Sequence, residues 1–243
     1  MGASRSLAGK VVLVTGATGD LGRVLVKRLR EEGAVVAAVY RNESGFQEIL
    51  ALGGGPADSL AGIKADVTSA AEVTAAVEAA LRRFGRVDAL LNLVGAYRGG
   101  NEVGATPEED WDFLMATNLK SVFLCCRAVL PAMTKAGSGR IVNVAARPAV
   151  EKKGRAKSGA YAISKAGVVI LTETIAEESR RSGITANCVV PGTIDTPKNR
   201  AEIHGADPSK WASPEEIAEV LLFLLSGDSS AVSGAAIPVY GKS

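Results

Sequence analysis

The chain has 243 residues, which is long enough for one large α/β domain with a deep core. With 47% hydrophobic and 22% charged residues, its composition excludes an intrinsically disordered protein. A formal net charge of +2 is too small to indicate nucleic acid or an anionic membrane surface as a partner.

Histidine and cysteine content narrows the chemistry further. His204 is the only histidine, which argues against histidine-based triads and multi-histidine metal sites, so we expect no metal. The three cysteines, Cys125, Cys126 and Cys188, have no metal-ligand spacing and are typical of reduced core thiols in a cytoplasmic protein. No apolar run approaches the roughly 18 residues of a membrane helix, so the sequence predicts no membrane partner.

In chain order, the first predicted unit is a strand, a glycine-rich turn and a helix. A β-branched run over residues 10–15 leads into the turn, and a helical pattern follows until Gly33. Glycines at such a turn let backbone N–H groups approach a pyrophosphate at a helix N-terminus. Asp20 suits a helix N-terminus but must point away from any phosphate. The candidate nucleotide-binding residues here are Gly16, Thr18, Gly19, Asp20, Leu21 and Gly22.

The second predicted strand, residues 34–39, ends next to a candidate cofactor-selecting residue. An acidic residue after this strand would bind the ribose hydroxyls of the adenosine, but the chain reads Tyr40-Arg41-Asn42. Arg41 is placed to meet a 2′-phosphate, so we expect NADP as the preferred cofactor, with NAD as the other possibility. The alternative is that Arg41 is a solvated loop residue.

The remaining pattern alternates strands and helices. Strands are predicted over 61–65, 87–93, 139–146, 184–190 and 236–239, with helices over 69–84, 107–135, from 161 onwards and 213–225. Residues 147–157 form a basic loop, and the polar stretch 195–212 is a candidate substrate lid. Such alternation with short links predicts a single α/β domain over 1–243, a doubly wound parallel sheet with helices on both faces, after a flexible start at 1–8.

Tyr161 and Lys165 are the candidate catalytic pair. Four residues apart on a helix, their side chains share one face. An ammonium under a phenol favours the ionised form of the phenol. This lowers the pKa of the phenol toward neutral pH, where it can act as a proton donor. The alternative is structural, a half-exposed tyrosine over the stem of a surface lysine.

Taken together, the chain resembles the short-chain dehydrogenase/reductase family over nearly its whole length. The matching elements are Thr15-Gly16…Gly22, Asp66-Val67, Asn92…Gly95, Asn118, Tyr161…Lys165 and Asn187…Pro191-Gly192…Thr196. The resemblance implies a Rossmann-type, seven-stranded sheet in the order 3-2-1-4-5-6-7 and a homodimer or homotetramer.

The same resemblance implies roles for individual residues. Tyr161 would be the general acid, Lys165 would lower its pKa and hold the nicotinamide ribose, and Asn118 would position a water that relays protons. Backbone groups at Ile194 and the hydroxyl of Thr196 would face the nicotinamide amide. The other cofactor-binding positions carried over are Asp66, Val67, Asn92, Gly95, Pro191 and Gly192, together with Tyr161 and Lys165.

The chain departs from the family at the end of the fifth strand. A serine there normally holds the substrate oxygen, whereas this chain has Ala146, fifteen residues before Tyr161 (161 − 146 = 15). Losing one such donor typically costs about 2.7–4 kcal/mol of transition-state stabilisation. The glycine spacing also departs, and both features resemble the dihydropteridine reductase branch, as do residues 95–101, 195–200 and the spacing up to Trp211. That branch implies hydride transfer to a conjugated ring such as a quinonoid dihydropterin.

Two other functions remain open from the sequence. One is a ketone or alcohol oxidoreductase in which another group replaces the serine, and the basic loop or Arg147 holds an anionic substrate; the structural alternative is a solvated charged turn. The other is a nucleotide-binding sensor or assembly protein with little turnover. The candidate substrate-contacting residues are Tyr97, Ala146, Arg147 and Trp211, of which Trp211 is alternatively a core anchor for the lid. The natural substrate and the physiological direction are left open.

Overall fold

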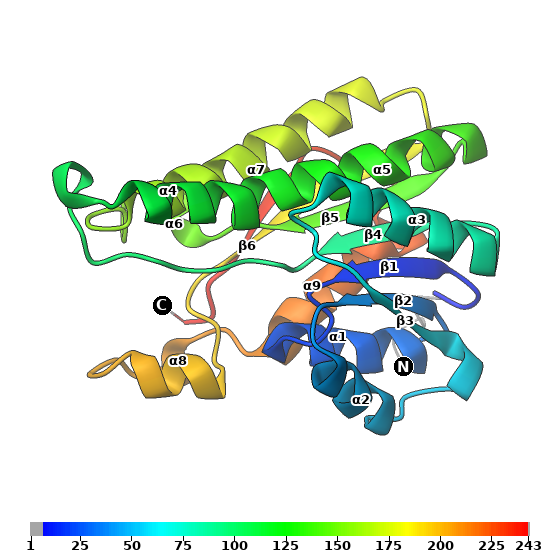
Figure 1. The fold of residues 1–243 in the computed structure, drawn as a ribbon, viewed down its shortest axis with the longest axis horizontal. Helices are drawn as coiled ribbons and strands as arrows, with labels where there is room; N and C mark the ends of the chain where they lie inside the picture. The colour runs from blue at the N-terminus through cyan, green and yellow to red at the C-terminus, as the bar shows by residue number, and fades with distance from the viewer. Residues whose placement is uncertain (1–6, 243) are drawn as a thin grey trace.

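The computed structural model describes residues 7–242, and Figure 1 shows them as one parallel sheet between two layers of helices. The strands are β1 (Val11–Thr15), β2 (Val35–Tyr40), β3 (Leu60–Lys64), β4 (Ala89–Asn92), β5 (Gly139–Val144), β6 (Ile184–Pro191) and β7 (Ala236–Val239). The helices are α1 (Asp20–Glu31), α2 (Glu43–Ala51), α3 (Ala70–Phe84), α4 (Glu108–Leu114), α5 (Ser121–Ala136), α6 (Arg147–Val150), α7 (Gly159–Glu178), α8 (Pro197–Glu202) and α9 (Pro214–Leu225).

The sheet confirms the predicted topology. Its strand order is β3-β2-β1-β4-β5-β6-β7, and every pairing between neighbours is parallel. Parallel strands are covered on both faces, which explains why β1 and β6 are buried along their whole length and consist mainly of apolar residues. The order reverses between β1 and β4, and in such sheets ligands bind at the carboxyl ends of the strands beside this point.

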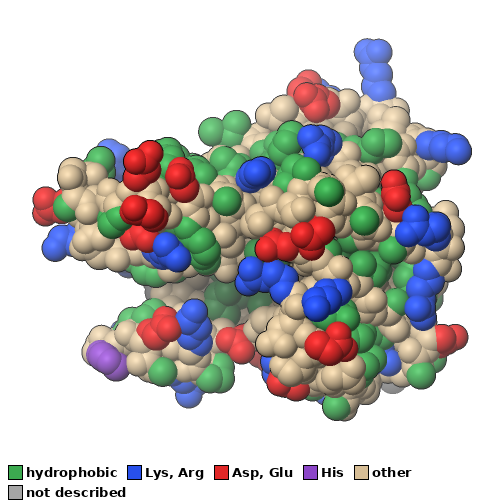
Figure 2. Space-filling view, in the orientation of Figure 1, with side chains coloured by type: hydrophobic (Ala, Val, Ile, Leu, Met, Phe, Trp, Pro, Cys, Tyr) green, Lys and Arg blue, Asp and Glu red, His purple; other side chains and the backbone are tan. Residues whose placement is uncertain are grey.

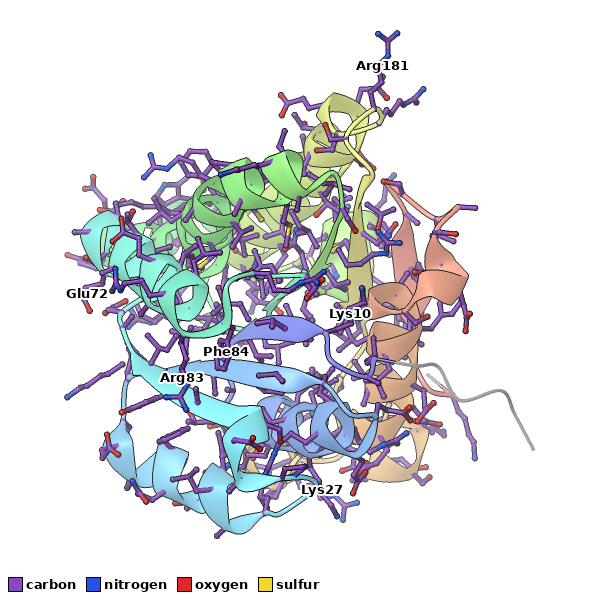
Figure 3. The ribbon with its side chains drawn as sticks, turned by 90° about the vertical axis from the view of Figure 1, so that its right-hand side faces the viewer. Lys10, Lys27, Glu72, Arg83, Phe84 and Arg181 are labelled. Carbon is purple, nitrogen blue, oxygen red and sulfur yellow. The ribbon has the colours of Figure 1, made fainter. Side chains whose placement is uncertain are left out.

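Two hydrophobic clusters hold the layers together. On one face α3, α5 and α7 contribute residues such as Val77, Val129 and Val168, each buried. On the other face α1, α2 and α9 contribute Leu29, Ile49 and Leu221, also buried. The side view in Figure 3 shows the sheet between these layers, with Phe84 at the end of α3. Both faces of the sheet are therefore fully used.

A buried chain of amide and hydroxyl groups also crosses the sheet. Thr15 Oγ1 donates to Asn92 Oδ1 at 3.4 Å, and Asn92 Nδ2 donates to Asn143 Oδ1 at 2.9 Å. Asn143 Nδ2 then donates to Thr172 Oγ1 of α7, also at 2.9 Å. Because buried polar groups are costly unless satisfied, these bonds fix α7 against β1, β4 and β5.

The long helix predicted over 107–135 is made of α4, one π-helical stretch (Met115–Lys120) and α5. Over Glu108–Ala136 it is, by length and composition, long and apolar enough to cross a membrane, contrary to the expectation from the sequence. One side of it packs in the core, through residues such as Val122, Cys126 and Met133. A core helix of this kind passes the same test of length and composition.

Other sequence predictions need correction. Helix α2 was not predicted, the basic loop begins with the short helix α6, and the lid contains α8. The predicted flexible start at 1–8 lies mostly outside the described residues, and Leu7 is buried in the core. Val122 of α5 and Val168 of α7 are buried within the single chain.

Candidate active site

The glycine turn between β1 and α1 has the shape that a bound pyrophosphate requires. Gly16 has a φ of 69°, and a Cβ there would lie 3.0 Å from the Val94 backbone nitrogen. A Cβ on Gly22 would overlap the Gly16 carbonyl oxygen, so this position accepts only glycine. Gly19 is the N-cap of α1 and supplies no side-chain cap, which leaves the first amides of the helix available to an anion. These observations fit a dinucleotide phosphate.

The adenosine end of the same edge holds Arg41 and Asp66. The Arg41 side chain is 76% exposed, and its guanidinium lies 3.9 Å from the Asp66 carboxylate. The backbone N–H and the hydroxyl of Thr68 both donate to Asp66 Oδ1, and these bonds, with Arg41, lower the pKa of Asp66. Arg41 is therefore weakly held and free to turn toward a phosphate. Val67 is buried beside Asp66.

The catalytic candidates lie in and around the first turns of α7. Tyr161 is half-buried, whereas Lys165 is buried and donates from Nζ to the carbonyl oxygen of Val144 at 2.9 Å. Burial lowers the pKa of Lys165 to about 8. Burial, followed by the nearby Tyr97, raises the pKa of Tyr161 to about 12.

The direction of the Tyr161 shift is opposite to the sequence prediction. The physical reason is that the ammonium of Lys165 is committed to the Val144 carbonyl while the phenol is desolvated against Tyr97. A phenol with a raised pKa is fully protonated at neutral pH. It is protonated at its ordinary pKa as well, and the raised pKa makes Tyr161 a weaker acid than a free phenol.

Asn118 lies in the π-helical stretch, and all of its amide atoms have protein partners. Asn118 Oδ1 accepts from the Ala96 N–H at 2.8 Å, and Nδ2 donates to the Ala96 carbonyl and to Ser164 Oγ, each at 3.0 Å. Local π-helical geometry often occurs at functional sites because it re-aims a side chain. Here it fastens the loop after β4 to α7. The water relay through Asn118 stays a prediction.

Gly95 completes this cluster. A Cβ on Gly95 would lie 2.9 Å from Lys165 Nζ and 3.5 Å from Asn118 Oδ1. The loop after β4 therefore passes directly over the ammonium, and a larger residue at position 95 would have to displace the end of the Lys165 side chain. Gly95 and Asn118, which are distant in the sequence from Tyr161 and Lys165, thus lie against the first turns of α7.

Tyr97 is the substrate-contacting candidate that the structure places beside the catalytic tyrosine. Its ring meets the Tyr161 ring edge to face, with centroids 5.0 Å apart and planes at 79°. The Tyr97 side chain is 65% exposed. Ala146 is buried at the N-cap of α6, at the carboxyl end of β5, and carries no hydrogen-bonding side chain.

The two other substrate candidates are engaged elsewhere. Arg147 donates to Glu151 Oε2 at 2.7 Å, and its guanidinium lies 4.4 Å from the centre of the Tyr240 ring. Trp211 is buried at the base of the lid, where Gly241 packs against its backbone. These contacts favour the core-anchor interpretation of Trp211.

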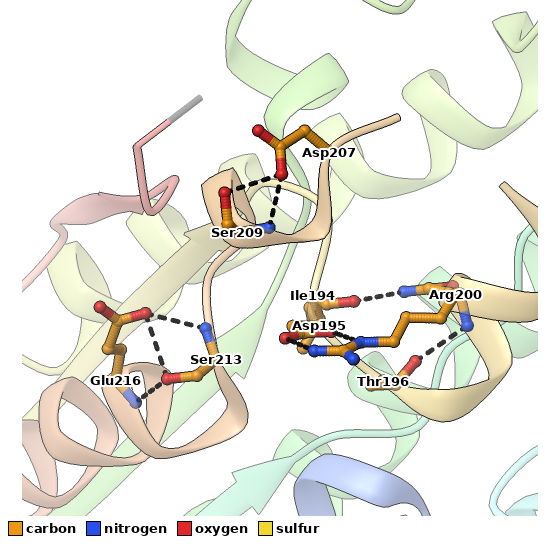
Figure 4. A network of polar contacts seen from close by, with 9 residues as sticks. Ile194, Asp195, Thr196, Arg200, Asp207, Ser209, Ser213 and Glu216 are labelled. Atoms are coloured by element: carbon orange, nitrogen blue, oxygen red, sulfur yellow. Dashed lines mark hydrogen bonds and ion pairs between the residues drawn. The ribbon is translucent and has the colours of Figure 1, made fainter. Parts of the chain in front are cut away.

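The lid folds through bonds among its own residues, shown in Figure 4. Arg200 pairs with both oxygens of Asp195 at 2.5 and 2.7 Å, and Asn199 Nδ2 donates to the Ile194 carbonyl at 2.8 Å. The hydroxyl of Thr196 caps α8 by accepting from the Asn199 N–H. Pro191 and Gly192 precede the lid at the end of β6, where Gly192 N–H donates to Val239.

Figure 2 shows the molecule hollowed between the lobe of α4 and α6 and the lobe of α8. Because α4, α6 and α8 follow β4, β5 and β6, the hollow lies at the carboxyl edge of the sheet. The glycine turn, Tyr161 and the lid all belong to this edge. Among the described residues 7–242, no group of three or more metal-ligating side chains was found.

Sequence reasoning missed three partners in this site. Ser164 Oγ donates to the Tyr161 carbonyl and accepts from Asn118, the Val144 carbonyl binds Lys165, and Arg23 donates to the Thr18 carbonyl to close the glycine turn. A backbone carbonyl has no sequence signal. Ser164 lies within the tyrosine–lysine motif, but its partner is distant in sequence. Asn92, a predicted cofactor residue, uses its side chain inside the sheet.

Comparisons with known proteins agree with this geometry. The short chain dehydrogenase family model matches residues 10–206. A 3-oxoacyl-(acyl-carrier-protein) reductase from Vibrio cholerae is 35% identical, covering 97% of this chain and 98% of its own. A D-threitol dehydrogenase from Mycolicibacterium smegmatis is 34% identical, and the match covers 97% of this chain and 93% of the relative. The crystal structure of a short-chain dehydrogenase/reductase from Burkholderia xenovorans superposes with a TM-score of 0.86 at 36% identity, covering 98% and 97%.

The finer resemblance to the dihydropteridine reductase branch is not supported by these relatives. These relatives are an oxoacyl reductase and a polyol dehydrogenase, which act on carbonyl and alcohol groups. The lid and loop similarities that suggested a pterin substrate are therefore weaker than the similarity over the whole chain.

Proposed function

Because the chain belongs to the short-chain dehydrogenase/reductase family, we propose that it interconverts a carbonyl compound and its alcohol with a nicotinamide cofactor. The observation that carries this proposal is the protonated Tyr161 beside the buried Lys165, at the edge that holds the glycine turn. A bound nicotinamide would supply the hydride. Tyr161 gives the proton to the substrate oxygen, and Asn118 and Gly95 keep the loop after β4 in place over Lys165.

The direct test is anaerobic oxidation of NADPH and NADH with a panel of ketones, diketones and 3-oxoacyl thioesters, alongside quinonoid dihydropterin. Turnover with the carbonyl compounds alone supports the proposal. Turnover with the dihydropterin alone would contradict it and restore the branch resemblance. Tight cofactor binding with no turnover on any substrate would favour a nucleotide-binding sensor.

We propose NADP as the preferred cofactor, on the strength of Arg41. The residues after β2 are Tyr40, Arg41 and Asn42, and the nearest acidic residue, Glu43, accepts a hydrogen bond from the Tyr40 hydroxyl at 2.6 Å. The ribose therefore meets no free carboxylate after this strand, whereas a 2′-phosphate meets an exposed guanidinium.

Replacing Arg41 by alanine is expected to raise the Kd of NADPH about 10- to 100-fold and to change that of NADH less than threefold. A lost charge-assisted contact to phosphate of about 1.5–3 kcal/mol gives this range. Titration of both cofactors by calorimetry measures it, with Arg82→Ala on α3, which is exposed and paired with Glu78, as the matched control. Equal losses for both cofactors would contradict a phosphate contact.

We also propose that the chain forms a homodimer or homotetramer through α4, α5 and α7. Their outer sides expose large apolar residues: Phe113, Phe123, Ile163 and Ile170, with Ile170 62% exposed. Exposed large apolar residues on neighbouring helices are a feature of protein–protein contacts.

The localisation we propose is cytoplasmic, and the partner we propose is a small-molecule substrate.

For the pair of substitutions Ile163→Glu and Ile170→Glu we expect a shift to the monomer in light scattering at micromolar concentration. Two buried charges without partners oppose the association of these faces. The matched control is Leu50→Glu on α2, in the opposite helix layer, where an exposed leucine is also replaced. A wild-type monomer, or a double variant that stays oligomeric, would contradict this interface.

A further inference from the structure

The site has a gap where a carbonyl-reducing enzyme needs a second hydrogen-bond donor. As hydride adds to a carbonyl carbon, negative charge gathers on the oxygen, and a preorganised donor stabilises that charge. Ala145 and Ala146, at the end of β5, are both buried and have no polar side-chain atoms. A second donor beside Tyr161 must therefore come from another polar side chain of the site.

Most of the neighbouring donors are already committed. Ser158 Oγ donates to the carbonyls of Gly154 and Arg155, and Ser164 Oγ donates to the Tyr161 carbonyl. Arg98 pairs with Asp110 at 2.7 Å and covers the Phe113 ring at 3.7 Å. Arg147 is held by Glu151 and Tyr240, as described above. Each of these groups would have to break an existing contact to reach a substrate oxygen.

The phenol of Tyr97 differs from all of them. Within residues 7–242, no hydrogen bond from its hydroxyl to another protein group is found, and the side chain is 65% exposed. Its ring is nevertheless held in place by the edge-to-face contact with Tyr161 at 5.0 Å. The two phenols are close enough for Tyr97 to raise the pKa of Tyr161.

The hydroxyl of Tyr97 lies against Gly99. A Cβ on Gly99 would overlap the Tyr97 hydroxyl oxygen, and it would also lie 3.1 Å from the Lys157 carbonyl. The N–H of Gly100 donates to that same carbonyl at 2.7 Å, which ties the loop after β4 to the start of α7. The loop thus clears space for two functional groups, Lys165 Nζ at Gly95 and the Tyr97 hydroxyl at Gly99.

We propose that the hydroxyl of Tyr97 donates the second hydrogen bond to the substrate oxygen, in the place of the serine that Ala146 lacks. This inference rests on the proposed carbonyl–alcohol function. In reduction, the hydride forms the new C–H bond, the electron pair of the C=O π bond moves to the oxygen, and Tyr161 gives that oxygen its proton. Tyr97 keeps its own proton throughout and only stabilises the developing charge.

The decisive variant is Tyr97→Phe, which keeps the ring contact with Tyr161 and removes only the hydroxyl. We expect kcat on the best carbonyl substrate to fall about 10²- to 10³-fold, as when one oxyanion donor is removed, with KM and cofactor Kd within threefold of wild type. We expect the double variant Tyr97→Phe with Ala146→Ser to have a kcat at least tenfold higher than Tyr97→Phe alone, because the serine supplies the missing donor.

Two further variants separate the hydroxyl from the ring. Tyr97→Leu removes both, so it lowers kcat as far as Tyr97→Phe and also raises KM. Gly99→Ala displaces the hydroxyl without removing it, and it lowers kcat at unchanged cofactor Kd. Thermal unfolding of each variant shows that the fold is retained.

The outcomes distinguish this inference from the proposed function. A wild-type protein that binds NADPH but reduces no carbonyl compound overturns the function and this inference together. Wild-type turnover with a Tyr97→Phe kcat within threefold of wild type overturns the inference alone. A loss that Ala146→Ser leaves unchanged also overturns it, because the hydroxyl then does not act as a substitute for serine.

Discussion

Tyr161→Phe is expected to lower kcat for carbonyl reduction by about 10²- to 10⁴-fold, the range for removing a positioned proton donor. The reason is that in the proposed reaction the Tyr161 phenol, which is protonated at neutral pH, gives the substrate oxygen its proton. Phenylalanine preserves the ring packing against Tyr97 but has no proton to give. Single-turnover oxidation of NADPH by stopped flow measures the effect on the chemical step.

Cofactor affinity provides the control for this experiment. The glycine turn and Arg41 are distant in sequence from Tyr161 and keep their geometry, so titration should give a Kd within about threefold of wild type. A variant that retains kcat within tenfold of wild type would show that the proton comes from another group. On a quinonoid ring we expect a smaller loss than on a ketone, because less charge is localised on one oxygen.

Lys165→Met is expected to abolish measurable turnover and, unusually for a core substitution, to stabilise the fold. The pKa of Lys165 falls from 10.5 to about 8 because burial penalises the ammonium. At about 1.4 kcal/mol per unit, this is a cost of about 3 kcal/mol at pH 7. Methionine fills similar space without charge, but leaves the Val144 carbonyl without its donor, which costs about 1–3 kcal/mol.

The net gain at pH 7 is therefore expected to be about 0–2 kcal/mol, measured by urea unfolding. The pH dependence gives a sharper signature. Between pH 8 and 10.5 the unfolded wild type binds more protons than the folded one at this site, so this group makes wild-type stability rise with pH. Lys165→Met lacks that rise. A variant that is much less stable than wild type at pH 7 would contradict a buried, penalised ammonium.

Most strands were predictable from the sequence because parallel strands are buried on both faces and are rich in apolar residues, whereas the sheet order followed from the family resemblance. Helix α2 escaped prediction because nine residues with Phe46 and Ile49 as the buried apolar anchors give a weak periodic pattern. The π-helical stretch also has no local signal. It depends on Asn118 pairing with the backbone of Ala96, 22 residues earlier in the chain.

The residues of the candidate site were predictable, but their electrostatics were not. The spacing of Tyr161 and Lys165 indicates that they share one face of a helix, and in the structure both residues lie on α7. The direction of the Lys165 ammonium depends on the Val144 carbonyl, which lies at the end of β5 and is distant from Lys165 in the sequence. The direction of the Tyr161 pKa shift follows from burial and from Tyr97, so it required the tertiary structure.

The self-contained bonding of the lid has a consequence for how new specificity arises. The Asp195–Arg200 pair, the Thr196 cap and the Asp207–Ser209 contact all lie within residues 195–212, and none of them supports a strand. The ends of the segment are tied to the rest of the domain, because Ala212 bonds to Thr193 and Asp195 and Trp211 and Ala212 are buried, so substitutions at the exposed positions of α8 are those expected to leave the sheet unchanged. A library that randomises the exposed positions of α8 can explore new substrates while the rest of the enzyme keeps its stability.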